Sequence, residues 1–177
     1  MKKYDLVIIG GGSAGLSAAE FGSKLGVRIA IIEKNKIGGD CTWTGCIPSK
    51  TLIETANVLH TIKGSSSYGL DISEPQVSFP RVMDRVNQVV ADIYAEESPQ
   101  VLSESGIDVI PGSPRFLDKH TVEVEGKRIR SKSFILSTGA HVWIPPIPGL
   151  GEVDYLTYEH VWMLKDLRER MVVLGGG

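Results

Sequence analysis

One unit at the start of the chain restricts the fold more than any other feature. Tyr4–Ile9 is an apolar run that only Asp5 interrupts, as expected of a parallel strand that is buried on both faces. A glycine-rich turn at 10–15 follows at once, then a helical pattern, then a second apolar run at 27–32 that ends in Glu33. This order is the fingerprint of a dinucleotide-binding βαβ unit. The sequence therefore predicts an α/β fold: a Rossmann-like domain, with a mostly parallel sheet, helices on both faces and a small antiparallel meander.

The spacing Gly-x-Gly-x-x-Gly gives each glycine a task. Gly10 makes the turn, Gly12 lets the backbone approach a pyrophosphate, and Gly15 lets the helix pack closely on the strand. The helix N-terminus would hold the phosphates, and Glu33 would bind ribose hydroxyls. The fingerprint does not separate NAD from FAD. A glycine-rich turn that binds nothing, with Glu33 as a solvated strand end, is the alternative.

The only two cysteines of the chain, Cys41 and Cys46, lie close together. In one regular helix, residues five apart point roughly 140° away from each other and cannot easily reach disulfide distance. Gly45 can supply a sharp turn, and the proline two residues after Cys46 suits the first turn of a helix. We expect a loop through Cys41, a turn at Gly45 and a helix from about Cys46. The helix N-terminus, with Lys50 one turn further, would lower the pKa of a thiol.

Composition limits what the cysteines and the chain can do. A zinc site would need two more ligands, and the chain has no Cys-x2-Cys or paired-His spacing, so no metal site is expected. The alternative to a redox pair is that both cysteines are buried and chemically inert. A net charge of −2 without a basic block argues against nucleic acid or an anionic membrane as partner. No run of 18 apolar residues exists, and we expect a cytoplasmic protein. The four histidines lie outside any motif.

The remaining elements follow from apolar spacing and turn residues. Expected are helices at 46–59 and 79–94, strands at 107–110 and 134–136, a turn at 112–114, a hairpin of 121–124 with 127–129, and a short helix around 158–164.

With these motifs in view, the chain resembles the N-terminal part of class I pyridine nucleotide–disulfide oxidoreductases. The resemblance covers essentially all residues. It rests on the glycine turn, Glu33, the cysteine motif at 38–50, the Ser-Thr-Gly segment at 137–139 and a proline-rich exit at 145–149. The family includes dihydrolipoamide dehydrogenase, glutathione reductase and mercuric reductase. It implies that electrons pass from NAD(P)H through FAD and the Cys41–Cys46 disulfide to a small disulfide substrate or mercuric ion, in a homodimer.

The resemblance also implies roles for single residues. Cys41 would exchange with substrate, Cys46 would lie beside the flavin, and Lys50 near the flavin ring. Gly175 and Gly177 would open an NAD(P) site. The residues implied to bind FAD are Gly10, Gly12, Ser13, Ala14, Gly15, Glu33, Lys34, Gly39, Asp40, Cys41, Gly45, Cys46, Lys50, Ser113, Pro114, Ser137, Thr138 and Gly139.

Two positions depart from the commoner family pattern. Asp40 stands where much of the family has Thr, and a carboxylate beside a pyrophosphate is unfavourable unless it points away or pairs with a cation such as Lys34. Trp43 and Thr44 lie between the cysteines where lipoamide dehydrogenases carry Asn-Val, which brings the stretch nearer to mercuric reductases.

The end of the chain repeats its beginning. The apolar run 171–174 leads into glycines, as 7–9 leads into the first turn. We expect residues 1–149 to form the first segment of an FAD-binding domain, and 150–177 a linker and the first strand of a truncated NAD(P)-binding domain. Such a fragment would lack the family's acid–base histidine and be inactive alone. A non-catalytic nucleotide-binding module with structural cysteines is the alternative function. The cysteine pair argues against a third, another flavoenzyme such as an amine oxidase.

Overall fold

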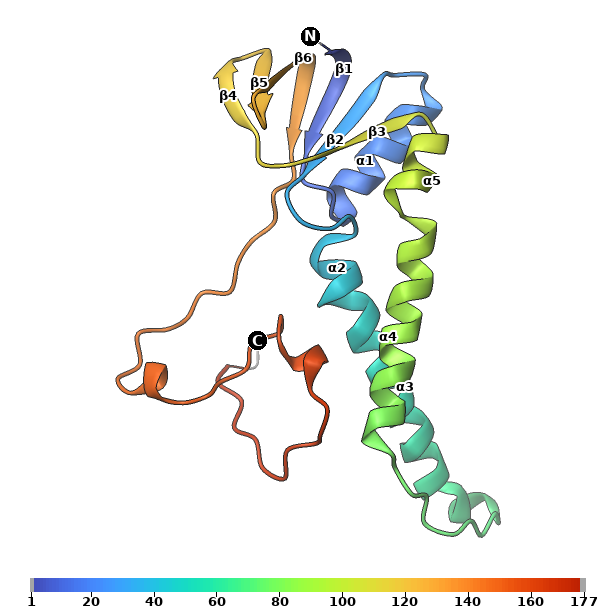
Figure 1. The fold of residues 1–177 in the computed structure, drawn as a ribbon. Coiled ribbons are helices and arrows are strands. Elements are labelled where there is room, and N and C mark those ends of the chain that lie inside the picture. Colours follow the sequence, from blue (N-terminus) through green and yellow to red (C-terminus); the bar gives the residue numbers. More distant parts are fainter. Residues whose placement is uncertain (1, 176–177) are drawn as a thin grey trace.

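The computed structural model describes residues 2–175 and shows one six-stranded sheet (Figure 1). The strands are β1 (Lys2–Ile9), β2 (Ile29–Glu33), β3 (Ile107–Pro111), β4 (Arg115–Asp118), β5 (Thr121–Val124) and β6 (Lys127–Leu136), in the order β3-β2-β1-β6-β5-β4. β1 pairs in parallel with β2 and β6, and β2 with β3. β4, β5 and β6 form an antiparallel meander. The predicted fold class is confirmed.

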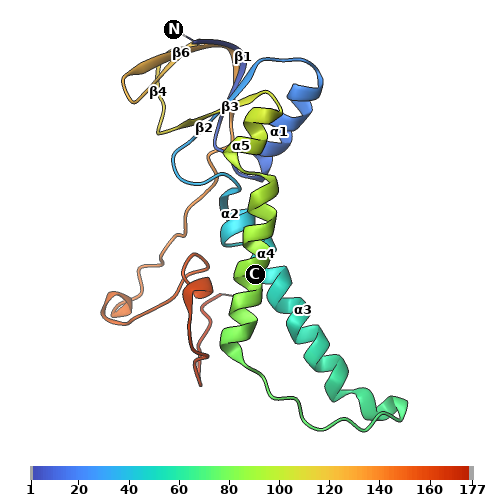
Figure 2. The same ribbon diagram turned by 45° about the vertical axis from the view of Figure 1, so that its right-hand side comes forward.

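The helices lie on one face of the sheet and below it. They are α1 (Ser13–Lys24), α2 (Gly39–Trp43), α3 (Cys46–Lys63), α4 (Phe79–Glu96) and α5 (Pro99–Glu104), with short 3-10 turns η1 (Ser65–Tyr68), η2 (Leu150–Glu152) and η3 (Val161–Met163). α3 and α4 pack as an antiparallel pair that extends away from the sheet (Figures 1 and 2). Among the described residues, no helix is long and apolar enough to cross a membrane.

The sheet has an apolar core on each face because β1 and β2 alternate their side chains between the two. Ile8 and Ile31 face α1 and α5, where they join Leu16 in one buried cluster. The neighbouring Val7 joins the other cluster, together with Val122 of the meander. The described residues thus cover this second face with strands, and the expected helices on both faces are found on only one.

Three other features of the structure differ from the sequence-based predictions. Residues 127–136 form one strand, not two, because β6 pairs first with β5 and then with β1. β4 was missed, since its four residues are all exposed and show no apolar alternation. The expected strand at 171–174 does not form, and its side chains are exposed, with Val172 at 88%. Gly177 lies outside the described residues.

The cysteine segment is attached to the first glycine turn by backbone. The Gly38 N–H donates to the Gly11 carbonyl at 2.8 Å, and Gly12 and Gly38 form an isolated parallel bridge. A Cβ on Gly39 would lie 2.8 Å from the Gly12 Cα, closer than real Cβ atoms come. The fold therefore requires glycine where the two turns pass.

This contact gives a stability prediction. Gly39 has φ 57° and Gly69 has φ 75°, so alanine meets similar backbone strain, roughly 1 kcal/mol, at both. A Cβ on Gly69 meets nothing within 4 Å. We expect Gly39→Ala to lower the free energy of unfolding by about 1–3 kcal/mol more than Gly69→Ala does, measured by urea denaturation. Equal losses would contradict the close approach.

Candidate active site

A cavity of about 1000 Å³ opens where the parallel strands end. Ile9, Glu33 and Leu136, the last residues of β1, β2 and β6, all line it. The carboxyl ends of parallel strands are where open α/β sheets bind ligands. The predicted cofactor residues in its lining are Gly10, Gly12, Ser13, Ala14, Glu33, Lys34, Gly39, Asp40, Ser113, Pro114, Ser137, Thr138 and Gly139.

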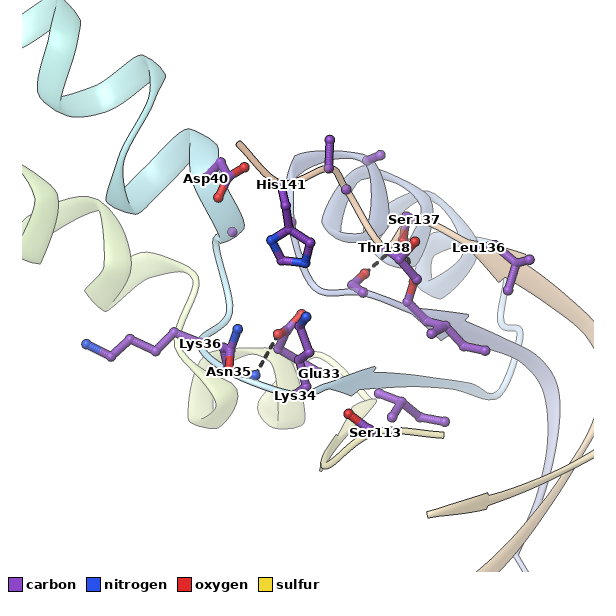
Figure 3. Close-up of a pocket in the computed structure, with 18 of the residues that line it drawn as sticks. Glu33, Lys34, Asn35, Lys36, Asp40, Ser113, Leu136, Ser137, Thr138 and His141 are labelled. Atoms are coloured by element: carbon purple, nitrogen blue, oxygen red, sulfur yellow. Dashed lines mark hydrogen bonds between the residues drawn. The ribbon is translucent and has the colours of Figure 1, made fainter. Parts of the chain in front are cut away.

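Glu33 is fixed by backbone donors from both sides. One carboxylate oxygen accepts the Gly11 N–H at 2.7 Å. The other accepts the Asn35 N–H at 2.7 Å, as Figure 3 shows. Each oxygen keeps further acceptor capacity. The carboxylate is therefore held at the cavity wall and can still accept hydrogen bonds from a ligand's hydroxyl groups.

The segment after β6 crosses directly over the first glycine turn. The Ser137 hydroxyl lies 2.9 Å from the Gly10 carbonyl and 3.1 Å from the Ile9 carbonyl, with its proton shared between them. A Cβ on Gly10 would come within 2.1 Å of the Ser137 carbonyl oxygen. This crossing places Thr138 and Gly139 in the cavity wall.

The cysteine segment differs from the predicted loop. Cys41 lies inside the short helix α2, Gly45 is in the turn that follows, and Cys46 is the first residue of α3, as expected. Both cysteines are free thiols; Cys41 is half-buried and Cys46 exposed. The prediction of a loop was wrong because α2 forms on Gly38, whose backbone is already fixed against the first glycine turn.

The acidic thiol is Cys41. The Ser13 hydroxyl lowers its pKa most, and the Cys46 thiol, the Cys46 N–H and the Lys50 ammonium lower it further. The neighbouring Cys41 raises the pKa of Cys46. The start of α3 lowers the pKa of both thiols through the Cys46 N–H and Lys50, but at Cys46 the effect of the neighbouring Cys41 is larger and the pKa rises.

Asp40 points into the cavity but does not pair with Lys34 as suggested. Its carboxylate accepts the Tyr158 hydroxyl at 3.2 Å. Trp43, three residues further, donates its indole N–H to the Ile37 carbonyl at 2.8 Å and carries the Lys36 ammonium 4.3 Å from its ring centre. Lys34 and Lys36 both line the cavity, and they bring positive charge to a wall that also holds Asp40.

Some predicted residues are not part of the cavity lining, and some lining residues were not predicted. Gly15, Cys41, Gly45, Cys46, Lys50 and Gly175 are not part of the lining. His141 was set aside as a loop residue, yet its ring points between Asp40 and the turn at Asn35 (Figure 3). Its place just after Gly139 was the available signal. Also missed were Asn35, Lys36, Trp43, Thr44, Gly112, Phe116 and Glu159. No cluster of potential metal ligands occurs among residues 2–175.

The order of the two thiols can be tested by alkylation. We expect Cys41 of the reduced chain to reach half-maximal iodoacetamide reactivity at a lower pH than Cys46, measured per peptide by mass spectrometry. Ser13→Ala should move the Cys41 midpoint upward, because the thiolate loses its largest stabilising neighbour. Ser17→Ala, on the exposed side of the same helix, is the control. An unchanged Cys41 midpoint in Ser13→Ala would contradict the assignment.

Comparison with known proteins agrees with this geometry. Residues 4–177 match the family model for pyridine nucleotide-disulphide oxidoreductases. The chain is 37% identical to a mercuric reductase of Bacillus cereus over 98% of its own length and 28% of that protein's, and 32% identical to a dihydrolipoyl dehydrogenase of Acholeplasma laidlawii over 99% and 54%. The chain thus spans about a third to a half of these relatives.

A solved structure shows the same arrangement. The Cu(II) complex of RclA, a HOCl-induced flavoprotein disulfide reductase from Escherichia coli, superposes with a TM-score of 0.74 at 31% identity, covering 94% of this chain and 36% of that one. The glycine turn held by Glu33 and the paired thiols agree with these matches. The chain therefore belongs to the pyridine nucleotide–disulfide oxidoreductase family.

Proposed function

We propose that the chain holds FAD in the strand-end cavity and carries the dithiol of an NAD(P)-linked disulfide oxidoreductase. One observation carries this proposal: helix α2 lines the cavity with Asp40 and Trp43, followed by its C-cap Thr44, and bears Cys41 beside Cys46. A module that only bound a nucleotide would have no need of an acidic thiol on the helix that forms part of this wall.

The cavity fits an extended dinucleotide. Its volume of about 1000 Å³ is at the upper end for ligand pockets. Gly12, at the start of α1, carries no side chain between the helix N-terminus and the cavity, and a helix N-terminus attracts phosphate. Glu33 is held for ribose hydroxyls, and Ser113 and Pro114 line the wall where the family places adenine. When bound, FAD would supply two-electron transfer between nicotinamide and the thiol pair.

The two thiols divide the chemistry between them. The Cys41 thiolate attacks one sulfur of a substrate disulfide, forming a mixed disulfide and releasing the other sulfur as a thiol after protonation. Cys46 then attacks Cys41, which releases the second thiol and leaves the Cys41–Cys46 disulfide to be reduced again. The lowered pKa of Cys41 favours it as attacking thiol, and Lys50 stabilises the negative charge.

Small disulfides and mercuric ion are the two proposed substrate classes. The relatives include both mercuric reductases and dihydrolipoyl dehydrogenases. Trp43 and Thr44, which line the cavity between the cysteines, favour the mercuric type by resemblance.

For the whole protein we propose a cytoplasmic homodimer, with the NAD(P) site and the acid–base group contributed mainly by other parts of it. Turnover by this chain alone is not expected.

Visible spectroscopy tests the function. We expect the purified chain, incubated with FAD, to retain yellow colour after gel filtration, and mild reduction to produce a long-wavelength band from thiolate–flavin contact. Cys46→Ser should keep the colour and lose the band. A chain that stays colourless with FAD in excess would support the non-catalytic alternative.

The ribose role of Glu33 gives a separate prediction. Glu33→Gln removes the charge and places an amide donor where one backbone N–H now donates. We expect FAD affinity to fall about tenfold or more, since hydrogen bonds to a charged group contribute roughly 1.5–3 kcal/mol. Fluorescence quenching of FAD measures it, with the exposed Glu74→Gln as control. Equal affinities of the two variants would remove Glu33 from the site.

A further inference from the structure

The helix that carries Cys41 is too short to be stable alone. α2 has five residues, whereas isolated helices below roughly 12 residues are marginal in water. One side of α2 contacts α4 and Glu97, the residue that follows α4. The buried Thr42 donates its hydroxyl to Glu97 at 3.1 Å, and the rings of Trp43 and Tyr94 lie 4.9 Å apart.

The other attachment comes from a segment that lies 118 residues further along the chain. The Tyr158 hydroxyl donates to the Asp40 carboxylate at 3.2 Å, and the Trp162 indole N–H donates to the Thr44 carbonyl at 2.7 Å. Asp40 is the second residue of α2 and Thr44 is its C-cap, so the two contacts lie near opposite ends of the helix. Thr44 caps α2, so Trp162 satisfies a carbonyl of the kind that helix ends leave unpaired. Residues 158–162, which we call the strap, therefore hold α2 near both of its ends.

We propose that Tyr158 and Trp162 are positioning residues that hold α2, and with it Cys41, against the start of α3. The redox role of Cys41 rests on the function proposed above, whereas these contacts do not. The strap also contributes Glu159 to the cavity wall, so the same segment touches the thiol helix and the cofactor site.

The thiolate of Cys41 depends on donors that belong to other elements. Ser13 comes from α1, and the thiol and N–H of Cys46 from α3. Hydrogen bonds weaken within a few tenths of an ångström, so a small displacement of α2 removes them. The charged group that acts on Cys41 is Lys50 on α3. Asp40 is the neighbour of Cys41 in the chain, and its carboxylate pairs with the Tyr158 hydroxyl, so loss of that hydroxyl frees this end of α2.

Trp162→Phe tests the strap while keeping an aromatic ring. In the reduced chain we expect the pH midpoint of Cys41 alkylation to rise by on the order of 0.5 pH unit, toward the value of a free cysteine. The midpoint potential of the Cys41–Cys46 couple, measured in glutathione buffers, should shift with it. Trp143→Phe is the matched control, because Trp143 is 76% exposed.

Tyr158→Phe removes one hydroxyl and should move the same two readouts in the same direction. Its control is Tyr68→Phe at the far end of the helical pair, where the ring is 84% exposed. If Trp162→Phe does not fold, Tyr158→Phe decides. Wild-type values of both readouts in the folded variants would overturn the proposal. Neither readout uses flavin, so a failure here is distinguishable from a failure to bind FAD.

Discussion

The structure depends on a place where two glycine turns pass with almost no space between their backbones. Gly38 hydrogen-bonds to Gly11, and Gly39 approaches Gly12 so closely that a Cβ on Gly39 would clash with the Gly12 backbone. This contact brings the cysteine helix to the edge of the strand-end cavity. Without it, the dinucleotide fingerprint and the thiol pair would be two unrelated motifs on one chain.

The site is assembled from many short attachments rather than from one rigid core. The sheet fixes Glu33 and Ser137, which hold the glycine turn from two directions. α2 has no apolar core of its own and is fixed from α4 on one side and from the strap at 158–162 on the other. In our proposal, the reactivity of Cys41 depends on donors from α1 and α3 and on the contacts that hold α2, and no single motif contains it.

Sequence patterns predicted the parts of the fold that have local signals. The first βαβ unit and the start of α3 at Cys46 follow from periodicity, glycine and proline, and the motifs predicted about half of the residues that line the cavity. α2 could not be predicted, because its order comes from the glycine contact and from partners far away in sequence. The same holds for Tyr158 as the partner of Asp40, which no spacing indicates. The apolar run 171–174 has a strand pattern, but no described strand pairs with it.

The central claim is that the cavity and the thiol pair form one electron-transfer unit. Anaerobic reductive titration of the oxidised chain loaded with FAD tests it most directly. The account predicts about four electrons per bound flavin, two for the flavin and two for the Cys41–Cys46 disulfide, and about two in Cys41→Ser. Uptake of only two electrons by the wild-type chain, with its disulfide left intact, would contradict it.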